Sequence, residues 1–87
     1  MDRHEDKLSI NHNSHFSDIV NTLIQKLKGY RQDILYIKII DDNNNIIDNY
    51  ILRVKFSNID IFYKDMNVIK NTDIAGVALF ITKMYQK

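Results

Sequence analysis

The spacing of apolar residues changes twice along this chain, and this change limits the possible folds more than any other feature. Between positions 16 and 27 the apolar residues recur at the spacing of one helix face: Phe16, Ile19, Val20, Leu23, Ile24 and Leu27. From 33 to 64 apolar and polar residues largely alternate, as they do in strands with one covered face. Helical spacing then returns at Ile74, Val77, Ala78, Ile81, Met84 and Tyr85. The pattern predicts an α+β fold with the element order α-β-β-β-α.

Turn and capping residues set the expected boundaries of these elements. We expect a helix at 15–28 that ends at Gly29, and strands at 33–40, 47–56 and 59–64. The segment Asp41–Asn45 is rich in residues that favour turns, whereas residues 65–71 are expected to form a loop. Thr72 or Asn71 is expected to cap the last helix, and Gly76 within that helix indicates a close approach to a neighbouring element.

We expect residues 1–13 to form a flexible N-terminal arm and residues 14–87 to form one domain. A three-stranded antiparallel sheet would carry both helices on one face. The predicted core consists of Ile19, Val20, Leu23, Ile24, Leu27, Leu35, Ile37, Ile39, Leu52, Val54, Phe56, Ile61, Ile74, Val77, Ala78 and Ile81. A slip of one residue in the middle strand would bury Arg53 in place of Leu52, so the exposure of Arg53 tests the register.

Composition excludes several classes of protein. The 87 residues include no cysteine, which excludes disulfides and thiolate zinc sites, and the net charge of +1 is far from that of a strongly basic nucleic-acid domain. No apolar run approaches the ~20 residues that span a bilayer, and the charged start does not resemble a signal peptide, so we expect a cytoplasmic protein. Fifteen Ile, ten Asn and nine Lys indicate an AT-rich genome, and the short length favours a phage, a virus or another mobile element.

No constellation of residues predicts catalysis, a cofactor or a metal. His12, His15 and Asp18 are spaced three apart, but they fall at the end of the expected arm, where no fixed geometry or fourth ligand is expected. The aspartates around the first hairpin are of the kind that turns require, and neither a nucleophile motif nor a phosphate-binding glycine loop is present. We therefore expect a protein that is not an enzyme.

The face of the sheet away from the helices carries the one constellation that points to binding. Aromatic and cationic residues are predicted to share it: Tyr36, Lys38, Arg53, Lys55, Phe62 and Lys64. Rings that stack bases and cations that contact phosphates form a platform for single-stranded nucleic acid. The same residue types are common at protein interfaces and on ordinary solvated sheets, so all three interpretations stay open.

The last helix has more apolar residues than one sheet face needs to cover. The surplus residues are Leu79, Phe80, Met84 and Tyr85. A leftover apolar surface of this kind often marks an interface. We therefore expect self-association, as a homodimer, or a partner helix at this end of the chain.

The order α-β-β-β-α resembles that of double-stranded-RNA-binding domains over residues 15–87. That resemblance implies RNA contacts from a lysine-rich start to the last helix, from the first strand-to-strand loop and from the first helix. Here the first of these segments is Lys70-Asn71-Thr72-Asp73-Ile74-Ala75-Gly76, with one cation, and the loop is Asp41-Asp42-Asn43-Asn44-Asn45, so the RNA-binding residues are missing.

In size, element order and the second strand Ile51-Leu52-Arg53-Val54, the chain also resembles small phage anti-CRISPR proteins. That resemblance implies an inhibitor that works by contact with a protein. We therefore expect a non-catalytic interaction protein, encoded by a mobile element, that inhibits or modulates a host protein or a protein–nucleic acid complex. The alternative is a nucleic-acid-binding module that uses the open sheet face, and no membrane partner is expected.

Overall fold

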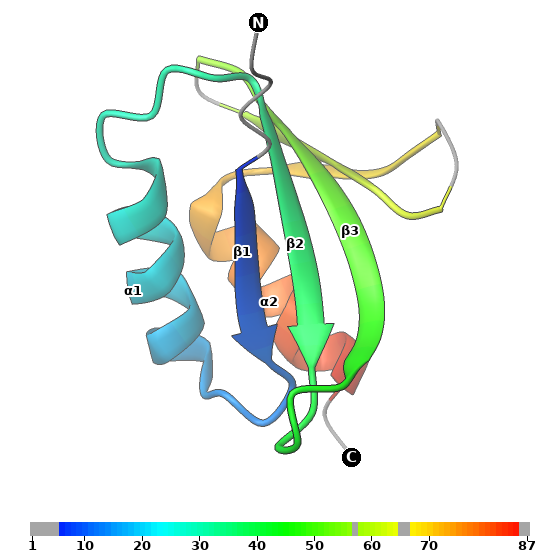
Figure 1. The fold of residues 1–87 in the computed structure, drawn as a ribbon. Helices are drawn as coiled ribbons and strands as arrows, with labels where there is room; N and C mark the ends of the chain where they lie inside the picture. Colours follow the sequence, from blue (N-terminus) through cyan, green and yellow to red (C-terminus); the bar gives the residue numbers. More distant parts are fainter. Residues whose placement is uncertain (1–5, 57, 65–66, 86–87) are drawn as a thin grey trace, which may run out of the picture.

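The computed structural model describes residues 6–56, 58–64 and 67–85 of the chain. Figure 1 shows the helices packed against one side of a twisted sheet. In chain order the elements are β1 (Lys7–Asn11), α1 (Phe16–Leu27), β2 (Ile34–Ile40), β3 (Ile46–Val54), β4 (Ile59–Phe62), β5 (Val68–Thr72) and α2 (Ile74–Tyr85). The α+β class predicted from the periodicity is confirmed.

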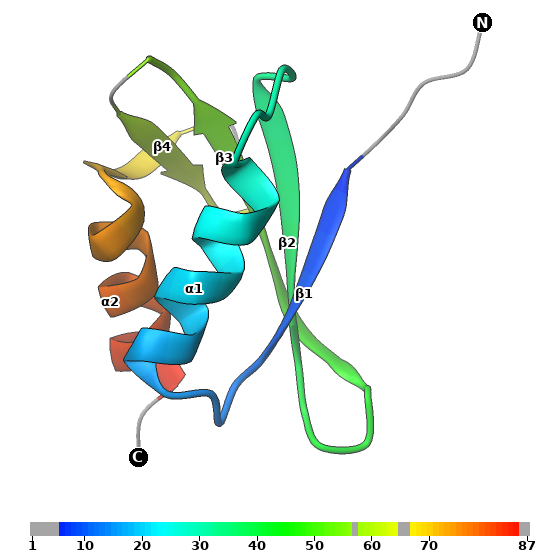
Figure 2. The same ribbon diagram turned by 90° about the vertical axis from the view of Figure 1, so that its left-hand side faces the viewer.

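The sheet has five strands in the order β1-β2-β3-β4-β5. The predicted antiparallel meander forms its centre as β2, β3 and β4, with Leu52 opposite both Leu35 and Ile61. β5 adds to one edge antiparallel to β4, and β1 adds to the other edge parallel to β2. The expected three-stranded antiparallel sheet is therefore wrong in strand number and direction, although both helices do lie on one face (Figure 2).

Both missed strands have weak sequence signals. β1 has only Leu8 and Ile10 on the helix side, and its residues 7–11 are part of the sheet instead of the expected arm, whereas residues 1–5 lie outside the described residues. In β5 the bulge at Ile61/Phe62 places Val68 opposite Phe62 and Lys70 opposite Ile61, with Ile69 between them. Alternation is lost there, which is why the segment was expected to be a loop.

Local chemistry sets the helix ends. Gly29 has a φ of 70°, the left-handed conformation expected after the last turn of α1. The α2 cap is Asp73, one residue later than expected, because its carboxylate accepts a hydrogen bond from the Gly76 N–H at 2.8 Å. Gly76 itself faces Thr72 so closely that a Cβ atom would overlap that side chain. This contact is the close approach that the glycine indicated.

Among the described residues, fourteen apolar ones are buried between the sheet and the helices or within the sheet: Ile10, Ile19, Leu23, Leu35, Ile37, Ile39, Tyr50, Leu52, Ile59, Ile61, Phe62, Val77, Ala78 and Ile81. Ten of the sixteen predicted core residues are among them, and the Arg53 side chain stays 43% exposed, so the predicted strand register is correct. Val20, Leu27, Val54 and Ile74 are partly buried. Two predictions are wrong, because Ile24 is 43% exposed and Phe56 is fully exposed.

Candidate functional site

Four of the predicted aromatic and cationic residues lie on strands and share the face of the sheet away from the helices, which we call the outer face: Tyr36, Lys38, Arg53 and Phe62. Tyr36, Ile51 and Phe62 lie in one row across β2, β3 and β4. Arg53 lies in the next row, opposite Asp60 of β4. Because strand side chains alternate, Lys38 lies on the same face two residues from Tyr36.

A buried carboxylate holds two of the predicted cations. The side chain of Asp60 is 5% exposed, and its Oδ2 atom accepts hydrogen bonds from Arg53 Nε at 3.2 Å and Nη2 at 3.0 Å. Lys55 Nζ lies 3.0 Å from the same oxygen, and Asn71 Nδ2 donates to Oδ1 at 2.5 Å. Hydrogen bonds from Asn71, Lys55 and Arg53 lower the pKa of Asp60 to about 2. The carboxylate is therefore charged at neutral pH and offsets part of the positive charge of this face.

The same arrangement covers one of the two predicted stacking rings. Phe62 is only 7% exposed, and the Arg53 guanidinium lies 5.1 Å from its ring centroid. Base stacking needs an accessible ring face, so Phe62 is poorly placed for it. Of the two predicted aromatics, Tyr36 is the one that keeps a partly exposed side chain.

Lys64 is placed apart from the other cations of the outer face. It follows β4 with a φ of 64°, and its Nζ atom lies 4.9 Å from the Tyr63 ring centroid. With Tyr36, Asn49 and Ile51 it lines a hollow of about 500 Å³ at the Ile46 end of β3. The predicted residues therefore form two groups, one around Asp60 and one around Tyr36.

The four predicted interface residues of α2 do not form one patch. The Phe80 ring meets Tyr50 edge-on at 5.6 Å, and Phe80 and Tyr85 are both partly buried against the core. Leu79 and Met84 are 45% and 55% exposed. These two are five residues apart, which places them about 140° apart around a helix of 3.6 residues per turn.

Tyr85 instead belongs to a hydrogen-bonded group centred on Asp48, which we call the Asp48 cluster. Tyr63 donates to Asp48 Oδ1 at 2.6 Å, and Tyr85 donates to Oδ2 at 2.7 Å. The hydroxyls of Tyr50 and Tyr85 lie 2.9 Å apart. The hydrogen bond from Tyr63, assisted by that from Tyr85, lowers the pKa of Asp48 despite desolvation, and burial raises the pKa of Tyr85. The cluster joins the end of α2 to β3 and to the residue after β4.

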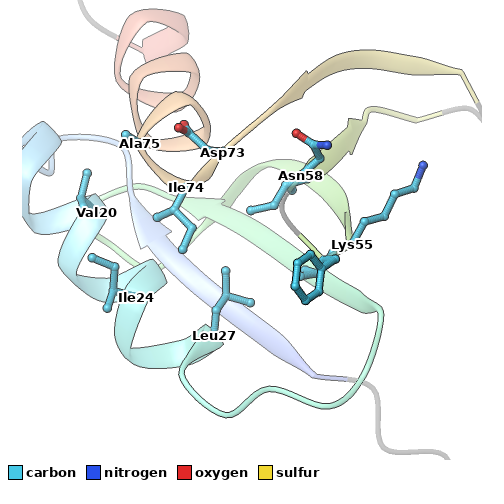
Figure 3. A pocket seen from close by; sticks show the side chains of 11 residues that line it. Val20, Ile24, Leu27, Lys55, Asn58, Asp73, Ile74 and Ala75 are labelled. Atoms are coloured by element: carbon cyan, nitrogen blue, oxygen red, sulfur yellow. The ribbon is translucent and has the colours of Figure 1, made fainter.

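A groove that was not predicted from the sequence opens between the helices and the β3–β4 turn. It has a volume of about 500 Å³, and most of its lining is apolar. Figure 3 shows Val20, Ile24 and Leu27 of α1 facing Ile74 of α2 across this space. The remaining lining residues are Val54, Lys55, Phe56, Asn58, Ile59, Asp73 and Ala75.

Phe56 is the most unusual residue of this groove. Its relative exposure is 107%, so folding hides none of its surface from solvent. The residue lies two positions after the end of β3, where the Lys55 N–H donates to the Asn58 carbonyl at 2.8 Å and turns the chain. The alternation that predicted a buried Phe56 therefore ends before reaching it. The available signal was that Phe56 directly precedes Ser57 and Asn58, two residue types that favour turns.

Among the described residues, no group of three histidine, cysteine, aspartate or glutamate side chains is arranged to hold a metal ion, and this includes His12, His15 and Asp18. In the described part of the chain, neither helix has the length and apolar character that crossing a membrane requires.

Comparison of the chain with models of known families, with curated proteins and with solved structures found no significant match. Function is therefore inferred from the geometry of the groove and the outer face.

Proposed function

We propose that this chain is a non-catalytic protein-binding domain and that the groove, with Phe56 at its rim, is its binding site. The observation that carries the proposal is the complete exposure of Phe56 beside an apolar hollow. An exposed phenylalanine ring keeps roughly 200 Å² of apolar surface in water, a cost that ends when a partner covers it. Aromatic anchors that fill or border a pocket supply much of the affinity of protein interfaces.

Charge supports a protein partner over a nucleic acid. The groove is bordered by one cation, Lys55, and one anion, Asp73, so it presents no excess of positive charge to phosphates. On the outer face, Arg53 and Lys55 contact Asp60, and Phe62 lies under Arg53. These contacts weaken the alternative in which the sheet binds single strands. The same contacts do not disfavour binding of a protein partner that inserts apolar side chains between α1 and the start of α2.

The role that we propose for this binding is inhibition or modulation of a host protein by a product of a phage, virus or other mobile element. Support for the origin comes from the composition, with fifteen Ile and ten Asn in 87 residues. A small domain with an apolar groove beside an exposed aromatic ring is suited to block a partner's own contacts.

Substitutions at two helix residues of nearly equal exposure test the site. Ile24 and Leu79 are 43% and 45% exposed, and both are apolar residues of a helix, but only Ile24 lines the groove. We expect Phe56→Ala and Ile24→Glu to abolish capture of a partner protein by the tagged chain, while Leu79→Glu leaves capture unchanged. Capture that survives both groove variants but is lost in Leu79→Glu would contradict the proposal and favour the α2 surface.

A parallel titration separates the nucleic-acid alternative. Single- and double-stranded oligonucleotides are titrated at low and at physiological salt, with the wild-type chain and with Arg53→Ala/Lys55→Ala. We expect no binding that depends on this cation pair. Binding that falls steeply with salt and disappears in the double variant would instead assign the outer face to nucleic acid.

A further inference from the structure

We propose that the open edge of β1 is a homodimer interface, at which β1 pairs antiparallel with β1 of a second copy and joins two sheets into one of ten strands. The proposal is independent of the groove. In the part of the chain that the structure describes, residues 7–11 form the edge strand of the sheet, with β2 as the one neighbouring strand. Edge strands present unpaired backbone groups that are a template for another strand.

The hydrogen bonds to β2 show which backbone groups of β1 point outward. The Tyr36 N–H donates to the Asp6 carbonyl at 3.0 Å, and the His12 N–H donates to the Ile40 carbonyl at 2.9 Å. Since residues that bond one neighbour alternate along a strand, the even-numbered residues of β1 face β2. The N–H groups of Lys7, Ser9 and Asn11 therefore point to the open edge.

This edge is complementary to itself. A two-fold axis at Ser9 places Ser9 opposite Ser9 of the second copy, Lys7 opposite Asn11, and Leu8 opposite Ile10. The residues with outward backbone groups then face one another, so the two Ser9 residues exchange both of their N–H···O bonds. Leu8, which is only partly buried in the single chain, gains an apolar neighbour on the helix side of the sheet.

Charge separates β1 from the other edge of the sheet. In β5 the central residue is Lys70, so self-pairing about its centre would place two ammonium groups opposite each other. A lysine at this place protects an edge from pairing with copies of itself. The single cation of β1, Lys7, lies near the strand end and would face the neutral Asn11.

The neighbouring helix also suits a second copy. The flank of α1 beside Leu8 presents Asn21, Thr22, Gln25 and Lys26 around a shallow hollow. Three of these are neutral polar side chains, and the Lys26 ammonium lies 3.9 Å from Asp6 of the same chain. In a two-fold pair both α1 helices lie on the same side of the joined sheet, so these flanks would approach each other without an uncompensated like charge.

The test is the mass of the full chain in solution, measured by sedimentation equilibrium over a wide concentration range. The wild type should approach twice the 10.3 kDa of one chain. Ser9→Pro removes an outward N–H that β2 does not use, and edge strands tolerate proline. We expect this variant to raise the dimer dissociation constant about tenfold or more, whereas the matched control Ser9→Ala, which keeps the N–H, should dimerise like the wild type.

A second variant and two further controls keep the test decisive if proline disturbs the strand. Ser9→Asp places two carboxylates opposite each other and should also give a monomer, with an unchanged circular dichroism spectrum. Lys70→Ala and Ile24→Glu should leave dimerisation intact, which separates this interface from β5 and from the groove. A wild-type chain that stays monomeric at millimolar concentration would overturn the proposal. A dimer that survives both Ser9→Pro and Ser9→Asp would do the same.

Discussion

Replacing Tyr85 with phenylalanine removes one hydroxyl from the Asp48 cluster and leaves the ring in place. That hydroxyl donates to the Asp48 carboxylate at 2.7 Å and lies 2.9 Å from the Tyr50 hydroxyl. A hydrogen bond to a charged group contributes about 1.5–3 kcal/mol to folding stability. Asp48 keeps its bond from Tyr63, and Tyr85 is only partly buried, so we expect a loss near the middle of that range, about 2 kcal/mol.

The assay is equilibrium unfolding in urea, checked by thermal melting. A loss of about 2 kcal/mol lowers the melting temperature of a domain of this size by roughly 10 °C. The matched control is Tyr36→Phe, since Tyr36 is a partly exposed tyrosine of the outer face whose hydroxyl makes no hydrogen bond to the described residues. Its melting temperature should stay close to that of the wild type.

The double variant Tyr63→Phe/Tyr85→Phe leaves Asp48 without either tyrosine donor. Because the two hydroxyls share one carboxylate, the losses should not be additive. A Tyr85→Phe chain that loses less than about 0.5 kcal/mol of stability but dimerises more weakly would refute this reasoning. It would instead support the expectation that Tyr85 lies at an interface.

Two further perturbations follow from the fold. Gly76→Ala should destabilise the chain by about 1–3 kcal/mol, despite the better helix propensity of alanine, because the new Cβ overlaps Thr72; Thr72→Ala should recover part of this loss in urea unfolding. The pKa of Asp60 is lowered to about 2, so its contribution to stability should be full above its ordinary value of 3.8 and decline as pH falls towards 2. The Asp60→Asn variant should be less stable than the wild type at pH 7 and should lose less stability between pH 3.8 and pH 2. A dependence of stability on pH identical to that of the wild type would contradict the stabilising role of the Asp60 carboxylate.

The centre of the fold could be predicted because burial on one face leaves a period of two or of 3.6 in the sequence. Leu35, Ile37 and Ile39 alternate with half-exposed residues in β2, and the two sets lie on the predicted faces. The sequences of β1 and β5 do not show such a period. Of β1 only Ile10 is buried, and in β5 the consecutive residues Val68 and Ile69 at the bulge are both 45% exposed.

The candidate site was less predictable because it depends on contacts between distant segments. The alternation of the strands places Tyr36, Lys38, Arg53 and Phe62 on one face. The sequence does not show that Asp60 forms ion pairs with Arg53 and Lys55, or that Arg53 covers Phe62. The groove needs α1, α2 and the β3–β4 turn in their final places, and its rim residue Phe56 lies where the strand alternation has already ended.

The most direct test of the binding site replaces Phe56 with a photoreactive phenylalanine analogue, which keeps an aromatic side chain at the rim of the groove. The chain is irradiated in an extract of the host cells, and the adducts are identified by mass spectrometry. The groove account predicts a protein adduct from position 56 that disappears when Ile24→Glu is added, and no matching adduct from the same analogue at position 36 on the outer face. Adducts from position 36 alone, to protein or to nucleic acid, would contradict it.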